Sequence, residues 1–226
     1  YTESSFLEMF VGKESVGLVF AASYCIALLV LIYLGRIIAF LGKRNTVLVL
    51  LGISMLALVV LMRATSAFFV IPAFAVYIAA LIAAWVGFDV LIETFSSDGL
   101  TGRIRGTQLT IMNIGWVITP VIAGFVLEIY GFAHIFTIAL FVTIVVALVL
   151  ACTFKNADGK GVVRTRGFFA TLRTVIEHRS ISHIFIIAFL LQFFYAWMVI
   201  YTPLYLLSIG IDWSDIGKIF SFMLLP

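Results

Sequence analysis

Residues 34–45 read LGRIIAFLGKRN and stand between two long apolar runs. Two glycines bracket the stretch, and Lys43 and Arg44 follow the second glycine. The preceding run, residues 16–34, is almost wholly apolar, and about 20 such residues at 1.5 Å each match a hydrocarbon core of about 30 Å. We therefore interpret residues 34–45 as a basic hairpin that joins two membrane spans and keeps Lys43 and Arg44 in water on the cytoplasmic side.

The composition of the 226-residue chain supports this interpretation. Hydrophobic residues make up 64% and charged residues 11%, against roughly 45–50% and 25% in soluble domains. The mean hydropathy is +1.22. Several windows exceed the roughly 18 apolar residues that a spanning helix needs, so the sequence predicts an all-α polytopic membrane protein embedded in the lipid bilayer.

The apolar runs predict six complete spans, at residues 16–34, 46–61, 68–91, 109–127, 132–154 and 181–208. Residues 1–11 read as the outer end of an earlier helix, and an apolar helix begins again near residue 216. The first residue is Tyr1. We expect an internal fragment of a longer chain.

Residues 155–180 form the long hydrophilic stretch of the chain. Within it, apolar residues recur at helical spacing opposite Arg173 and Glu177, which predicts an amphipathic helix at the inner membrane surface. The apolar residues are Phe168, Phe169, Leu172, Val175 and Ile176.

The basic residues predict an orientation. Of 14 Lys and Arg residues, all but Lys13, Arg63 and Lys218 fall in loops that this topology places inside. Such a bias is the positive-inside signal of an integral protein of the cell (plasma or inner) membrane, with residues 155–180 in the cytoplasm. Because these charges serve topology, the basic pI of 9.0 indicates no nucleic-acid partner.

The stretch at 34–45 resembles the loop between helices two and three of major facilitator superfamily transporters. The family pattern is Gly, three residues, Asp, Arg, any residue, Gly and two basic residues. Gly35, Gly42, Lys43 and Arg44 stand at matching places, which the resemblance implies act as a conformational loop motif. Residues 39 and 40 are Ala and Phe, where the family has the Asp and Arg of a charge relay.

A second resemblance lies in residues 155–180, which stand where the family has the cytoplasmic linker between its two six-helix halves. The resemblance implies a major-facilitator-like helix bundle with an N-terminal half at 1–154, the linker at 155–180 and the start of the second half at 181–226. It also implies a protein that is monomeric at full length.

Intramembrane polar and aromatic residues are candidates for a substrate cavity, because an unpaired polar group is costly in lipid. In the family, the helices that carry them face a central cavity. The alternative is that such residues only hold helices together, because an interhelical hydrogen bond stabilises a membrane bundle by about 0.6 kcal/mol on average. The candidates are Tyr24, Asn113, Gln192, Tyr195, Trp197 and Tyr201.

Asp89 lies well within an apolar run, one helical turn before Glu93 on the same face. We predict that these carboxylates couple transport to protons or gate it. The alternative is that Asp89, close to the inner interface, pairs with a loop cation. The candidates for that pairing are Lys43, Arg44, Arg103 and Arg105.

Gly115, Pro120 and Gly124 form a cluster in the fifth span that is similar to a glycine-proline pattern of family exporters. Small residues let helices approach closely, so we expect a helix-packing motif here.

We expect no catalytic residues, cofactor or metal site. The three histidines are scattered over both sides of the membrane, and Cys25 and Cys152 read as buried small hydrophobes. The resemblance implies a secondary active transporter that moves a small-molecule solute by alternating access, with coupling to an ion or to protons. The alternative is a multi-pass scaffold or assembly partner without transport activity.

Overall fold

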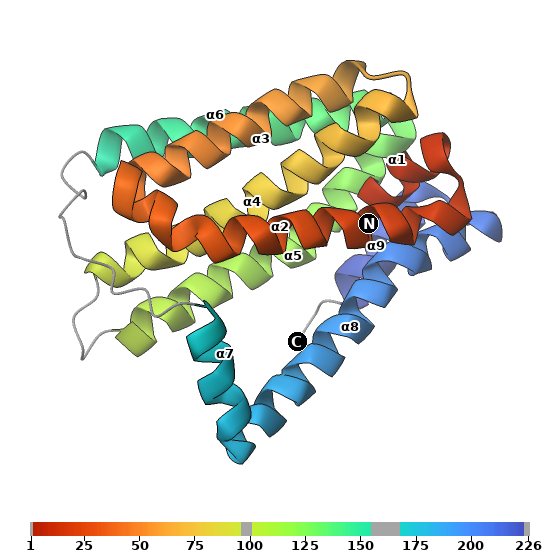
Figure 1. Cartoon of the computed structure of the whole chain (residues 1–226). Helices are drawn as coiled ribbons and strands as arrows, with labels where there is room; N and C mark the ends of the chain where they lie inside the picture. The colour runs from red at the N-terminus through yellow and green to blue at the C-terminus, as the bar shows by residue number, and fades with distance from the viewer. Residues whose placement is uncertain (1, 96–100, 155–167, 224–226) are drawn as a thin grey trace.

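The computed structural model describes residues 2–95, 101–154 and 168–223 (Figure 1). All regular structure in these residues is helical. Six of these helices, α2 to α6 and α8, are long and apolar enough to cross a membrane. This confirms the predicted polytopic all-α fold. The helices are α1 (Thr2–Val11), α2 (Lys13–Leu41), α3 (Lys43–Arg63), α4 (Ala67–Phe95), α5 (Thr101–Tyr130), α6 (Phe132–Thr153), α7 (Phe168–Glu177), α8 (Arg179–Ser208) and α9 (Trp213–Met223).

Single glycines separate three pairs of consecutive helices. Gly12, Gly42 and Gly131 have φ angles of 73°, 85° and 77°, a region of backbone conformation that costs little only for glycine. Each allows the chain to reverse within one residue. We call the end of the bundle that holds Gly12 and Gly131 the Gly131 end, and the opposite end the Gly42 end.

The predicted hairpin at 34–45 is wrong in extent. α2 continues to Leu41, so Gly35 lies inside a helix, and Lys43 and Arg44 form the first turn of α3. The apolar residues before Gly42 simply prolong the span. The turn is held by backbone and side-chain bonds, because the Gly42 amide donates to the Ile38 carbonyl at 2.9 Å and the Thr46 hydroxyl donates to the Gly42 carbonyl at 2.7 Å.

The loop expected before the fifth span is also shorter than predicted. α5 begins at Thr101, so Arg103 and Arg105 lie on its first turns rather than in a loop.

α4 is the centre of the α1–α6 bundle, packed between α2 and α3, with α6 on the outer side of α3. Small residues make this packing close: Ala79, Ala80, Ala83 and Ala84 are buried, and a Cβ atom at Gly87 would lie 2.8 Å from Val47. Two apolar clusters fill the core. One at the Gly131 end includes Phe6, Phe20, Leu58, Phe74 and Phe136, and one at the Gly42 end includes Leu34, Ile38, Val47, Leu91 and Leu150.

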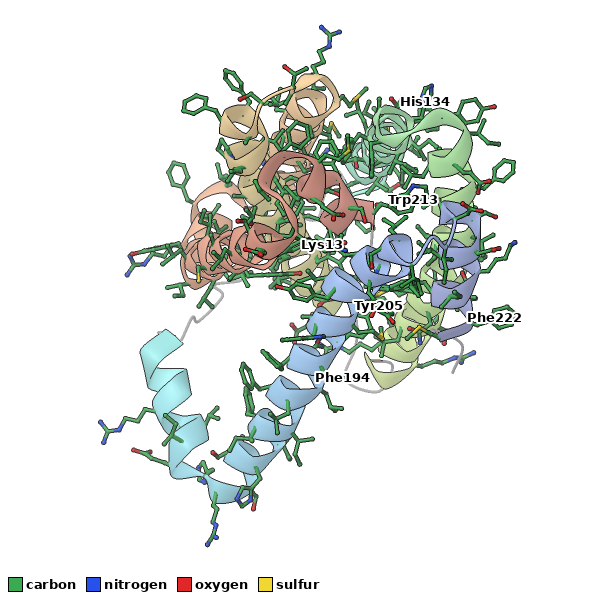
Figure 2. All side chains as sticks on the ribbon, turned by 90° about the vertical axis from the view of Figure 1, so that its right-hand side faces the viewer. Lys13, His134, Phe194, Tyr205, Trp213 and Phe222 are labelled. Carbon is green, nitrogen blue, oxygen red and sulfur yellow. The ribbon has the colours of Figure 1, made fainter. Side chains whose placement is uncertain are left out.

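The last three helices are arranged differently. α9 packs along α5, whereas α8 meets the bundle at the Gly131 end and then diverges from it, with α7 returning from its far end (Figure 1). The view from the Gly131 end shows the same divergence, with Trp213 and Tyr205 beside the bundle and α7 remote from it (Figure 2). α7 confirms the helix predicted over residues 168–177. The charged residues predicted at 155–166 lie outside the described residues.

Candidate functional site

The first contact between α8 and the bundle joins Tyr201 to Gly17. A Cβ atom at Gly17 would overlap with the Tyr201 hydroxyl, so the two helices meet because residue 17 has no side chain. Pro203 and Leu204, one turn nearer the Gly131 end, are buried. Tyr201 packs against the same cluster as Phe20 and Leu204.

The second contact joins α8 to α5. The rings of Trp116 and Tyr195 meet edge to face with 5.9 Å between their centroids. Beyond this contact, residues 183–194 of α8 are all exposed. The Trp116–Tyr195 pair therefore marks the point at which α8 leaves the bundle.

Three predicted cavity residues continue the faces that make these contacts. In a helix, residues three, four or seven apart share a face. Asn113 lies three residues before Trp116, and Gln192 three residues before Tyr195, each one turn nearer the Gly42 end. Tyr24 lies seven residues after Gly17, two turns along the face that Tyr201 touches. Tyr24, Asn113 and Gln192 are exposed.

Trp197 belongs to an aromatic row along α8. Its ring centroid lies 5.2 Å from that of Tyr201 and 6.3 Å from that of Phe193. The six predicted cavity residues thus lie on three helices. Tyr24 is on α2, Asn113 is on α5, and the other four are on α8.

The predicted packing motif in α5 divides into two parts. A Cβ atom at Gly124 would overlap with the Trp213 carbonyl of α9, and one at Gly217 would overlap with the Pro120 carbonyl. Gly115, by contrast, has nothing within 4 Å of such an atom. Gly124, Pro120 and Gly217 therefore form one tight crossing of α5 and α9, in which Gly115 takes no part.

Polar bonds flank this crossing on both sides. The Ser221 hydroxyl donates to the Val117 carbonyl at 2.6 Å. The Ser214 amide donates to the Glu128 carboxylate at 3.0 Å, at the N-terminus of α9, where negative charge is favourable. Neither Glu128 nor Ser214 was predicted from the sequence. The signal that could have found this seam is the pair Gly217 and Ser221, two small residues four apart on one helical face.

Asp89 lies near the Gly42 end and is exposed. The Gln108 side-chain amide donates to its carboxylate at 2.9 Å, which ties α4 to the first turns of α5. This contact replaces the predicted pairing with a loop cation. Glu93 is exposed one turn further along α4.

Arg44 of the predicted loop motif holds the end of α6. Its guanidinium donates to the Ala151 carbonyl at 2.7 Å, one of the last four carbonyls of α6, which have no partner within their own helix. A cation is also favourable there because of the helix dipole. Phe40 stands where the family pattern has an Arg. Its side chain is 87% exposed and carries no charge, so it cannot take part in a charge relay.

Glu3 carries no signal in the sequence, because residues 1–11 read as the outer end of a span, where a carboxylate is ordinary. In the structure it lies in a helix flanked by buried residues, from Ser4 to Leu7. Cys25 and Cys152 are free and exposed, so the expectation that they are buried is wrong. Within residues 2–95, 101–154 and 168–223, no three His, Cys, Asp or Glu side chains gather as metal ligands.

Within the described residues, six helices are long and apolar enough to cross a membrane, which defines a multi-pass helical membrane protein. A family model described as Major Facilitator Superfamily matches residues 7–225, and the chain belongs to that family. It matches no curated protein and no solved structure. Members of this family are transporters rather than enzymes, so the chain is that of a membrane transporter that lies in a lipid bilayer and carries a small-molecule solute.

Proposed function

We propose that this protein is a secondary active transporter that works by alternating access, and that the structure is closed at the Gly131 end. One observation carries the proposal: the contacts of α8 and α9 with α1–α6 gather at that end. Tyr201 meets Gly17 and Gly217 meets Gly124 there, and the Glu128–Ser214 bond joins α5 to α9. At the Gly42 end, α8 diverges (Figure 1).

The proposal divides the chain into the half at 1–154, the linker at 155–180 and the half that begins at 181. Rocking of one such half against the other is how facilitator-type folds expose a central site to each side in turn. The uneven distribution of Lys and Arg supports an orientation in the plasma or inner membrane with the Gly42 end and the linker on the cytoplasmic side. The arrangement is then inward-facing.

The proposed solute site lies between α2, α5 and α8, where Tyr24, Asn113 and Gln192 continue the contacting faces toward the open end. Tyr195, Trp197 and Tyr201 border it on α8. Amide groups that bind by hydrogen bonds, set among aromatic rings, suit a small solute with both polar and apolar parts.

A cross-linking experiment tests the alternating motion. In the full-length protein with Cys25 and Cys152 replaced by Ser, Glu128→Cys and Ser214→Cys are combined and bridged by a short thiol-specific cross-linker. The protein is reconstituted into vesicles that contain a trapped pH indicator. A panel of sugars, amino acids, organic cations and organic anions is then screened for solute-dependent proton flux and, with radiolabelled solute, for uptake.

Bridging this pair is expected to abolish uptake, because α5 and α9 must separate for the Gly131 end to open. The matched control is Ile129→Cys with Asp215→Cys, one residue further along each helix, where the side chains point about 100° away and cross-link poorly. Uptake that persists in fully bridged protein would refute alternating access at this seam. A protein that moves no solute of the panel would favour the scaffold alternative.

A further inference from the structure

We propose that α7 and the corner that it forms with α8 bind anionic phospholipids of the inner membrane leaflet, and that this contact sets the direction in which α8 leaves the bundle. The lipid contact depends on the position, the apolar face and the charge of α7 alone. Its effect on α8 rests on the alternating motion proposed above.

α7 lies across the direction of the bundle helices. α2 to α6 are long and apolar enough to cross a membrane and run between the Gly42 end and the Gly131 end. α7 runs across them in both views (Figure 1 and Figure 2). A helix that runs across the spans lies along the membrane plane, which is the orientation of an interfacial amphipathic helix.

α7 has an apolar face along its whole length. Phe168, Leu172 and Ile176 are four residues apart, so they share one face of the helix, with Thr174 on the opposite face. The side chain of Ile176 is 66% exposed, so α8 leaves this face uncovered there. A face of this kind is favourably buried at the boundary between lipid headgroups and acyl chains.

Positive charge accompanies this apolar face. Arg173 lies on α7, and Arg179 is the first residue of α8. Over residues 155–183 the sequence has six Lys and Arg against two carboxylates. The chain as a whole has a net charge of +3, so the positive excess of the protein lies in this stretch. The anionic lipids of the inner leaflet attract basic segments that lie beside a membrane.

Arg173 can exchange its present partner for a lipid phosphate. Its guanidinium donates to the Glu177 carboxylate at 2.7 Å, but the two side chains are 82% and 58% exposed, and an exposed ion pair adds little to stability. The order is also the less favourable one, because the cation precedes the carboxylate along the helix. A guanidinium binds a phosphate more strongly, through two parallel charge-assisted hydrogen bonds.

The single residue His178 joins α7 to α8. The His178 amide donates to the Thr174 carbonyl at 3.3 Å, and the Ser182 amide donates to the His178 carbonyl at 2.9 Å. α7 also packs against α8, so the corner couples the two helices. Residues 183–194 of α8, directly beyond the corner, are all exposed. A lipid surface that holds α7 therefore directs this part of α8 and favours the open Gly42 end.

The test measures how deeply residue 176 enters the lipid, with the full-length protein in nanodiscs. Cys25 and Cys152 are replaced by Ser, and a nitroxide is attached at Ile176→Cys or, as the matched control on the opposite face, at Thr174→Cys. The nanodiscs contain phosphatidylcholine with increasing amounts of phosphatidylglycerol. We expect the nitroxide at 176 to lose access to a water-soluble relaxation agent as phosphatidylglycerol increases, and the nitroxide at 174 to keep it.

Charge variants test the anionic partner. Arg173→Gln and Arg179→Gln should each raise the phosphatidylglycerol fraction needed for half-maximal protection about fivefold, whereas Arg63→Gln, at the other end of the bundle, should not change it. High salt should weaken the protection of wild type, because it screens charge. Equal protection in phosphatidylcholine alone or with phosphatidylethanolamine would overturn the proposal. Protection already complete in detergent without lipid would overturn it too, because protein would then cover this face.

Spin labels at residues 105 and 183 test the effect on α8. Without solute, phosphatidylglycerol should lengthen the distance between them, and the double variant Arg173→Gln with Arg179→Gln should cancel this change. A distance that ignores phosphatidylglycerol while residue 176 responds to it would overturn the effect on α8. Wild-type protein that moves no solute would refute the proposed transport function and leave the lipid titration of residue 176 unaffected.

Discussion

At the scale of single residues, backbone contacts at two glycines set how closely α5 and α9 approach. The atoms opposite Gly124 and Gly217 are the carbonyls of Trp213 and Pro120, and a carbonyl within a helix cannot turn aside as a flexible side chain can. A methyl group at either glycine must therefore push the helices apart. Gly115, which faces open space on the same helix, offers the matched comparison.

Gly217→Ala is expected to lower the stability of the closed arrangement by about 1–3 kcal/mol, the usual cost of overpacking a filled site. The measurement is the yield of the bridged product between Cys at 128 and Cys at 214, with thermal unfolding in detergent recorded beside it. Gly115→Ala makes the same chemical change and should alter neither quantity. Equal effects of the two substitutions would show that helix propensity, not contact, governs the result.

Asp89→Asn provides a second test at this scale. An amide at residue 89 can still accept a hydrogen bond from Gln108, so the α4–α5 contact survives while the charge is lost. We propose that this contact and the nearby Glu93 gate the Gly42 end. The pH dependence of uptake should then stay unchanged while the maximal rate shifts. Uptake assays at several pH values decide, since a lost pH dependence would assign proton coupling to Asp89.

At the scale of helices, the sequence predicts the elements better than the turns between them. Long apolar runs must become helices in lipid, because every backbone amide and carbonyl needs an internal partner. Residues 37–41 are equally apolar whether they extend a helix or line a hairpin, so composition could not locate the turn at Gly42. Its φ angle of 85° depends on packing that only the fold supplies.

The same limit explains the missed site residues. The pairing of Glu128 with Ser214 joins positions remote in sequence. The cavity candidates, in contrast, are single polar or aromatic residues in apolar runs, which hydropathy singles out directly.

Arg44 of α3 joins that helix to the end of α6 through the Ala151 carbonyl. Arg44→Ala removes the donor from the Ala151 carbonyl and should destabilise the last turn of α6 by about 1–3 kcal/mol, as expected when a charged hydrogen bond is lost. Hydrogen exchange over residues 150–154 is the measurement, and it should become faster. Arg63→Ala removes an exposed cation at the other end of α3 and should leave this exchange unchanged. Unaltered hydrogen exchange in Arg44→Ala would show that Arg44 does not stabilise the end of α6.

At the scale of the whole molecule, the two ends of the bundle differ in how α8 and α9 are held. α2, α3, α4 and α6 share apolar clusters at both ends, whereas α8 joins the cluster at the Gly131 end and continues into α7 at the other end. Because rocking opens one end of the molecule as it closes the other, closure at the Gly42 end requires the contacts at the Gly131 end to separate. The fold itself therefore indicates which distances should change when a solute binds and which should not.

We expect solute to bring α8 toward α5 at the Gly42 end while the Gly131 end loosens. Spin labels at residues 105 and 183, in a full-length protein without Cys25 and Cys152, should approach one another when the transported solute is added. Labels at 129 and 215 should move apart. The control pair, residues 40 and 153, lies on α2 and α6, which share the apolar cluster at the same end. This pair should keep its distance, because helices joined by one cluster move together. Pulsed electron-spin distance measurements give all three values, and opposite changes at the two ends are the signature of rocking. A change of the same sign at both ends would instead indicate that α8 merely detaches, and alternating access between these halves would have to be abandoned.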